Sequence, residues 1–160
     1  MKFAAIFPAL LSASSALALV HPRATANTTI ASFLEDSVNA FFPAPGNDGW
    51  EAAFDTAFAP NLTATFNDGS YDFDSFKAYF AAVKANLQSK YSTFDHSFTS
   101  VVGVSATVGN TGGYGIVTGV EGGDVSGTDV GGTDGAFAVI REIDGALKIV
   151  EWHEITNLGA

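Results

Sequence analysis

The chain has 160 residues, no cysteine, and 17 acidic against seven basic residues, which gives a formal net charge of −10. Without cysteine it can form neither disulfides nor cysteine-ligated metal sites, and it has no thiol nucleophile. The negative charge is unfavourable for binding nucleic acid or an anionic lipid surface, so neither is expected as a partner. The length is typical of one domain, and the 14 phenylalanines can supply its core.

The N-terminus has the pattern of a secretory signal peptide. Lys2 precedes an apolar run over 3–11, and a small-residue stretch ends in Ala16-Leu17-Ala18, the kind of site that signal peptidase cleaves. We therefore predict a signal peptide over 1–18, a short N-terminal segment over 19–28 and one domain over 29–160.

The predicted location of the mature protein is extracellular, with no membrane attachment after cleavage, because no later apolar stretch is long enough to span a bilayer. Asn27 and Asn61 each begin an N-x-T sequon and are predicted glycosylation sites on this route. A second cleavage at the lone basic residue Arg23 is an alternative that the sequence leaves open.

The first half of the domain has the period of amphipathic helices. Apolar residues recur at three- and four-residue steps over 30–42 and 50–58, and prolines follow both segments. Asp48 and Glu51 stand at capping-box spacing before the second segment. A third helix is predicted up to Leu87, opened by Asp72 or Asp74.

Strands are predicted on both sides of the third helix. Alternation over 62–73 around Asp68-Gly69 predicts a short hairpin. From Phe94 the period changes to two, and four strands are predicted, over about 94–108, 114–121, 136–143 and 147–156. The segment 122–135 is rich in Gly, Asp, Ser and Thr and is predicted to be a mobile loop. Helices followed by antiparallel strands predict an α+β domain.

Three segments resemble the SnoaL-like proteins of the nuclear transport factor 2-like (NTF2-like) superfamily: WEAAFDTAFAPN at 50–61, NDGSYDFDSFKAYF at 67–80 and AFAVIREIDGALKIVEWHEITN at 136–157. The resemblance implies a cone in which three N-terminal helices pack on a strongly curved, mainly antiparallel sheet, with an apolar pocket open at one end. Family members include polyketide cyclases, dehydratases, isomerases and proteins with no known reaction, so the fold does not define the function.

Candidate catalytic residues lie in the first long strand and the last strand. The family's cyclase pattern I-V-E-x-W-x-x-x-D reads IVEWHEITN here, so Glu151 matches it. Strict alternation places Glu151 and His153 on one face of the last strand, and His96 among apolar residues of the first long strand. If both faces line the cone, these three residues converge and can move protons next to a bound carbonyl.

Two alternatives for these residues stay open. They can be hydrogen-bonded polar residues beside the core. The last strand can also have the opposite register, with Trp152 inside and Glu151 and His153 outside. His96, His153 and Glu151 would also match a two-His-one-carboxylate metal pattern, but their spacing is not specific, and neither a metal nor a cofactor is predicted.

Aromatic side chains are the candidates for binding a ligand in the pocket, and we predict this role for Trp50, Phe54, Tyr79, Phe98 and Trp152. Three functions are compatible with these features. The first is a secreted SnoaL-like protein that binds a small apolar or aromatic molecule. The second is a cofactor-free cyclase, dehydratase or isomerase that uses His and Glu acid-base chemistry. The third is a non-catalytic interaction protein that forms a homodimer.

Overall fold

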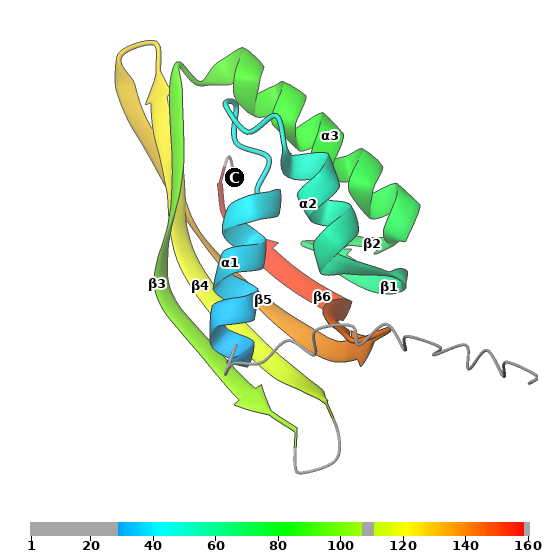
Figure 1. Cartoon of the computed structure of the whole chain (residues 1–160). Helices are drawn as coiled ribbons and strands as arrows, with labels where there is room; N and C mark the ends of the chain where they lie inside the picture. Colours follow the sequence, from blue (N-terminus) through cyan, green and yellow to red (C-terminus); the bar gives the residue numbers. More distant parts are fainter. Residues whose placement is uncertain (1–28, 107–110, 159–160) are drawn as a thin grey trace, which may run out of the picture.

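Residues 29–106 and 111–158 are described by the computed structural model (Figure 1). The predicted signal peptide, the segment 19–28, Arg23 and Asn27 lie outside the described residues. The elements in chain order are α1 (Ile30–Phe41), α2 (Trp50–Ala57), β1 (Phe58–Phe66), β2 (Gly69–Asp72), α3 (Phe73–Lys90), β3 (Thr93–Ser105), β4 (Gly112–Val125), β5 (Thr128–Ile143) and β6 (Ala146–Thr156).

The helices begin where side chains satisfy free backbone N–H groups. The Thr29 hydroxyl accepts a hydrogen bond from the Ser32 N–H at 3.1 Å and starts α1. Asp72 starts α3 through a capping box with Ser75, as predicted. The predicted capping box at α2 is wrong, because its N-cap residue is Gly49 and no side chain caps it. Asp48 forms an ion pair with Lys84 of α3 instead.

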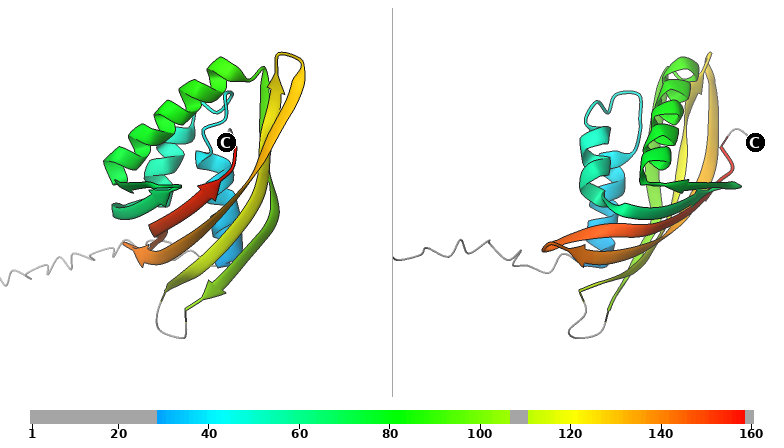
Figure 2. Two further views of the ribbon diagram at one scale, coloured as in Figure 1. Left: turned by 180° about the vertical axis from the view of Figure 1, so that it is seen from behind. Right: turned by 90° about the vertical axis from the view of Figure 1, so that its right-hand side faces the viewer.

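The six strands form one sheet in the order β2-β1-β6-β5-β4-β3. Four of the five strand pairs are antiparallel, and only β1 and β6 are parallel. The sheet curves around the helices, which lie on its concave face (Figure 2). The predicted α+β class with a mainly antiparallel, curved sheet is therefore confirmed. In the described part of the chain, no helix has the length and apolarity needed to cross a membrane.

The glycine-rich segment 122–135 is not a loop. Its two halves continue β4 and β5 and pair with each other, with Gly122 opposite Gly131 and Asp124 opposite Asp129. The chain reverses at Ser126-Gly127, where both residues have positive φ, as a type I′ hairpin turn requires. The loop prediction is wrong because glycine and aspartate are rare in strands, whereas here hydrogen bonds to the neighbouring strand determine the conformation.

The β1–β2 turn also differs slightly from the prediction. Phe66 pairs with Gly69, so the turn residues are Asn67 and Asp68 and not Asp68-Gly69. Asn67 has a φ of 48°, a conformation that asparagine adopts more readily than most residues.

The hydrophobic core is dominated by phenylalanine rings. Phe54 is fully buried, and its ring centroid lies 4.4 Å from that of Phe58 and 5.7 Å from that of Phe80. Trp50 is buried against the same cluster, 6.3 Å from Phe54. These rings pack α2 and α3 against the sheet, and the side chains beyond them enclose the cavity described next.

Candidate functional site

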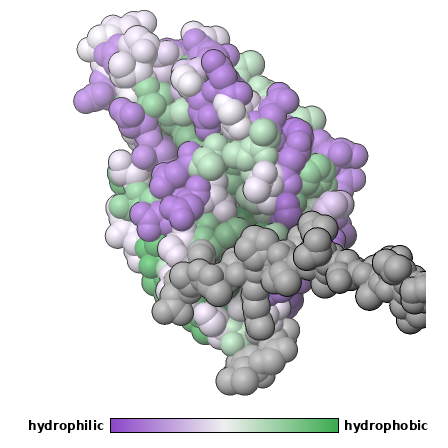
Figure 3. All heavy atoms as spheres, viewed as in Figure 1, coloured by the Kyte–Doolittle hydropathy of each residue, from purple (hydrophilic) through white to green (hydrophobic). Residues whose placement is uncertain are grey.

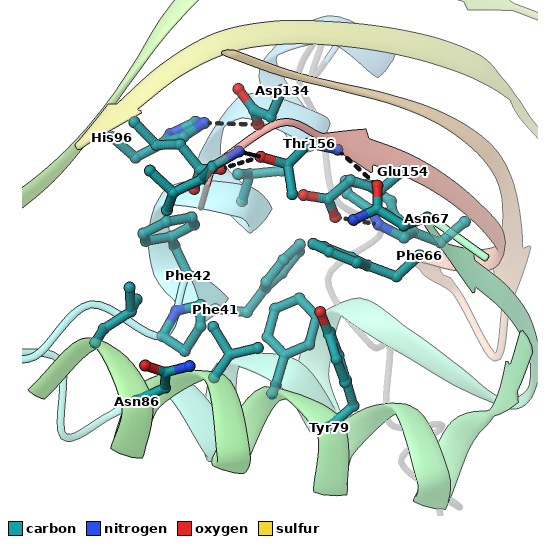
Figure 4. Close-up of a pocket in the computed structure, with 18 of the residues that line it drawn as sticks. Phe41, Phe42, Phe66, Asn67, Tyr79, Asn86, His96, Asp134, Glu154 and Thr156 are labelled. Atoms are coloured by element: carbon teal, nitrogen blue, oxygen red, sulfur yellow. Dashed lines mark hydrogen bonds and ion pairs between the residues drawn. The ribbon is translucent and has the colours of Figure 1, made fainter. Parts of the chain in front are cut away.

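A cavity of about 200 Å³ lies between α1, α3 and the inner face of the sheet (Figure 4). A cavity of about 150 Å³ with apolar walls holds benzene, so this one has room for a molecule with a single ring or slightly more. The helices and β1 supply most of its apolar wall, and the strands supply its carboxyl groups and its imidazole. Its aromatic lining residues are Phe41, Phe42, Phe66, Tyr79, Phe80, Tyr91 and Trp152.

Two of the five predicted ligand-binding residues, Tyr79 and Trp152, line this cavity. Trp50 and Phe54 lie in the core and do not reach it. Phe98 is half-buried, and its ring stands edge-on to the His96 ring at 5.0 Å. The sequence therefore indicates an aromatic pocket correctly but does not separate wall residues from core residues.

Cross-strand pairing brings polar side chains together at one end of the cavity. His96 of β3 is opposite Glu121 of β4, and Asp134 of β5 is opposite Thr156 of β6. Residues directly opposite one another point to the same face of a sheet. Glu154 stands two residues before Thr156 on β6, so its side chain points to the same face as that of Thr156. These five residues all line the cavity, and we refer to them as the polar end.

His96 and Asp134 lie within hydrogen-bond distance of each other at the polar end. His96 Nε2 lies 3.1 Å from Asp134 Oδ2, and the two side chains are only 5% and 7% exposed. Gly119 lies opposite Asp134 on β4 and makes room for the pair, because a Cβ there would stand 2.5 Å from Asp134 Oδ1 and 2.7 Å from His96 Nε2. The His96 ring also stacks on the Phe42 ring at 4.8 Å.

Two further carboxyl groups complete the polar end. Glu121 accepts a hydrogen bond from the Thr156 hydroxyl, and burial raises its pKa. Glu154 accepts a hydrogen bond from Trp152 Nε1 at 2.8 Å, and burial raises the pKa of Glu154 to about 8. Burial also raises the pKa of Tyr79 to about 12. At neutral pH, Glu154 is therefore mainly a carboxylic acid that can donate a proton, and Tyr79 is a neutral phenol.

Glu151 and His153 lie on the outer face of the sheet, away from His96. The pairing of β5 with β6 shifts by one residue at Val150, so that Ile149 and Trp152 are both buried. The predicted placement of Glu151 and His153 beside His96 is therefore wrong, and the opposite register of this strand end is observed. His153 Nδ1 instead contacts the Thr65 hydroxyl at 2.9 Å.

Glu121, Asp134 and Glu154 are site residues that are not predicted from the sequence. Asp134 precedes Ala136 and Ala138 at a spacing of two, which is the one local signal that it faces inward. Glu154 similarly follows the buried Trp152 by two residues. No group of three or more His, Asp or Glu side chains within 29–106 and 111–158 is arranged to hold a metal ion.

Comparison with known proteins identifies the fold. No model of a protein family matches the sequence, and no curated protein matches it. An NTF2-like superfamily protein from Salmonella enterica subsp. enterica serovar Typhimurium str. LT2 superposes with a TM-score of 0.59 at 13% identity, over 81% of this chain and 92% of that one.

Two further structures are similar. A protein described as a SnoaL-like polyketide cyclase from Jannaschia sp. CCS1 has a TM-score of 0.52 at 17% identity, over 80% of this chain and 88% of that one. The β subunit of benzoate 1,2-dioxygenase from Burkholderia mallei ATCC 23344 has a TM-score of 0.59 at 14% identity, over 80% of this chain and 88% of that one. The chain therefore has the NTF2-like fold that SnoaL-like proteins share, a fold that does not define its function.

Replacing Gly119 with alanine should separate His96 from Asp134. The backbone at Gly119 suits any residue, but the added Cβ would overlap both side chains, so we expect a loss of about 1–3 kcal/mol in the free energy of unfolding and a changed NMR signal of the His96 ring. Gly135→Ala is the matched control, because its Cβ would meet neighbours at an ordinary 3.6 Å. Equal behaviour of the two variants would contradict this account of the pair.

The stability of the protein should fall as the pH rises from about 4.5 to about 8. Because the pKa of Glu154 is raised on folding, the folded state binds more protons than the unfolded state in this range, and the contribution is lost above it. Urea unfolding at both ends of the range should show that Glu154→Gln reduces this pH dependence by about 2–4 kcal/mol. The exposed neighbour Glu151 is the control, and Glu151→Gln should leave the dependence unchanged.

Proposed function

We propose that the chain is a secreted SnoaL-like protein that binds a small apolar or aromatic molecule in the cavity between α1, α3 and the sheet. The observation that supports this most is the composition of the wall, in which aromatic side chains surround a polar end assembled from four strands. Ligand pockets are mostly apolar, with a few placed polar groups that fix the orientation of the ligand. A ring can pack against Phe42 and Tyr79 while His96 or Glu154 binds a polar substituent.

Secretion is part of this proposal and rests on the signal-peptide pattern over 1–18. The sequon asparagine Asn61 lies in β1 and is exposed, which is compatible with glycosylation along the secretory route.

Filling the cavity should abolish binding. Val83 of α3 lines the cavity, so Val83→Trp should occupy the space that a ligand needs. We expect the wild-type protein to bind at least one member of a panel of one- and two-ring aromatic compounds in calorimetry, and this variant to bind it at least about tenfold more weakly. Ala82→Trp, on the exposed side of α3, is the control that should retain binding. A wild-type protein that binds no compound would count against the proposal.

The His96–Asp134 pair favours a second candidate, a cofactor-free cyclase, dehydratase or isomerase. With Nε2 held by Asp134, the other ring nitrogen of His96 is left to exchange a proton with a bound molecule, and the Asp134 carboxylate stabilises the imidazolium that results. Glu154, as a carboxylic acid, can donate a hydrogen bond to a carbonyl oxygen. A base and an acid in one cavity are the groups needed to move a proton next to a carbonyl.

This second candidate predicts proton exchange at carbon. The protein should accelerate deuterium incorporation next to the carbonyl of a cyclic aryl ketone such as 2-tetralone in D₂O, followed by NMR. His96→Gln should slow this exchange on the order of a hundredfold. His153→Gln should leave the rate unchanged, because His153 lies on the outer face. Equal rates with and without the His96 substitution would exclude a catalytic role for that imidazole.

The outer face of the sheet supports a third candidate, a homodimer. Large apolar side chains are exposed there, among them Val102 and Ile116, which stand opposite each other on β3 and β4 and are 51% and 45% exposed. Hydrophobic surface is visible along the margin where β3 lies (Figure 3). Exposed apolar patches of this kind mark protein contacts when they are extensive.

Light scattering during size-exclusion chromatography should then give the mass of a dimer. Ile116→Lys should place a charge in the contact and yield a monomer, whereas Ala82→Lys on α3 should not. A wild-type protein that stays monomeric at high concentration would remove this candidate.

A further inference from the structure

The polar end of the cavity has more acidic than basic groups. Three carboxyl groups line it, against the imidazole of His96 and the exposed Lys90 at the end of α3. In the described part of the chain, His96 pairs with Asp134, while Glu121 and Glu154 form no ion pair. Glu121 therefore adds an unpaired negative charge to the cavity wall at any pH at which its carboxyl group is ionised.

An unpaired oxygen lies at the same place. Asp134 is 7% exposed, and its Oδ2 holds His96, but its Oδ1 has no hydrogen-bond partner among the described residues. Oδ1 packs against β4, 2.5 Å from the position that a Cβ of Gly119 would take. A buried carboxylate oxygen without a donor costs free energy, so a cation bound next to Asp134 would stabilise this carboxylate.

The aromatic wall next to these carboxyl groups is suited to a cation. The rings of Phe66 and Tyr79 are 4.9 Å apart at an angle of 49°, and Phe42 stacks on His96. The faces of aromatic rings attract ammonium groups, and the attraction is strongest where water is excluded. The Tyr79 phenol stays neutral and does not add a competing charge.

We propose that the ligand of the cavity is a small aromatic amine bound as its ammonium cation. The ammonium group would lie next to Glu121 and Asp134, and the ring would pack against Phe42 and Tyr79. This inference rests on the proposed binding function and names the chemical class of the ligand. An anionic ligand would be repelled by ionised Glu121 and Asp134, and a neutral one would leave Glu121 without a counter-charge.

A matched series of probes tests the charge directly. Calorimetry at neutral pH would compare 2-phenylethylamine, 2-phenylethanol and phenylacetate, which share a ring and differ in the charge of the end group. We expect the amine to bind at least about tenfold more tightly than the alcohol, and phenylacetate not to bind. In Glu121→Gln the advantage of the amine should fall to about twofold while the affinity for the alcohol stays the same. Glu151→Gln, on the outer face, should change neither.

The outcomes separate this inference from the proposed function. If the alcohol binds as tightly as the amine, or if the advantage of the amine survives in both Glu121→Gln and Asp134→Asn, the amine assignment is wrong while the cavity remains a binding site. Amine binding that persists in Val83→Trp places the amine outside the cavity and also overturns the assignment. If none of the three probes binds, the result counts against the cavity as a binding site and against this inference with it.

Discussion

The antiparallel pairing of β3, β4, β5 and β6 determines which side chains face the helices. With His96 opposite Glu121 and Asp134 opposite Thr156, polar residues from four strands meet on one face of the sheet, although they are far apart in the sequence. Gly119 sits between His96 and Asp134 and leaves the space in which they meet. A shift of one residue in any of these pairs would turn a side chain to the outer face, so the polar end depends on the register of the whole sheet.

The protein places groups that are costly to bury beside a core that is strongly stabilising. Rings such as Phe54 and Phe58 exclude water from the space between the helices and the sheet, and they favour folding by burying apolar area. At the other end, burial raises the pKa values of Glu121 and Glu154, which means that folding destabilises their charged forms. Perturbed carboxyl groups in a cavity are more typical of binding or catalytic sites than of structural cores.

The sequence predicts most of the fold because the local patterns are clear. The helical period, the helix start at Asp72 and the alternating strands all lead to the observed α+β arrangement. The site is less predictable, because an extra residue in a strand leaves no local signal. One extra residue at Val150 turns Glu151 and His153 outward, and a second shift after Phe98 turns Val102 outward while His96 stays inside. Asp134 is missed for a related reason, since only its pairing with β4 shows that the glycine-rich segment is a strand.

A crystal structure of the protein purified from a secreting host would test most directly whether the polar end borders an open cavity that holds a molecule. The account predicts electron density for a ring-containing molecule between Phe42 and Tyr79, with a polar group directed to His96, Glu121 or Asp134. A cavity closed by Phe42 and Tyr79 side chains, with His96 turned away from Asp134, would contradict it.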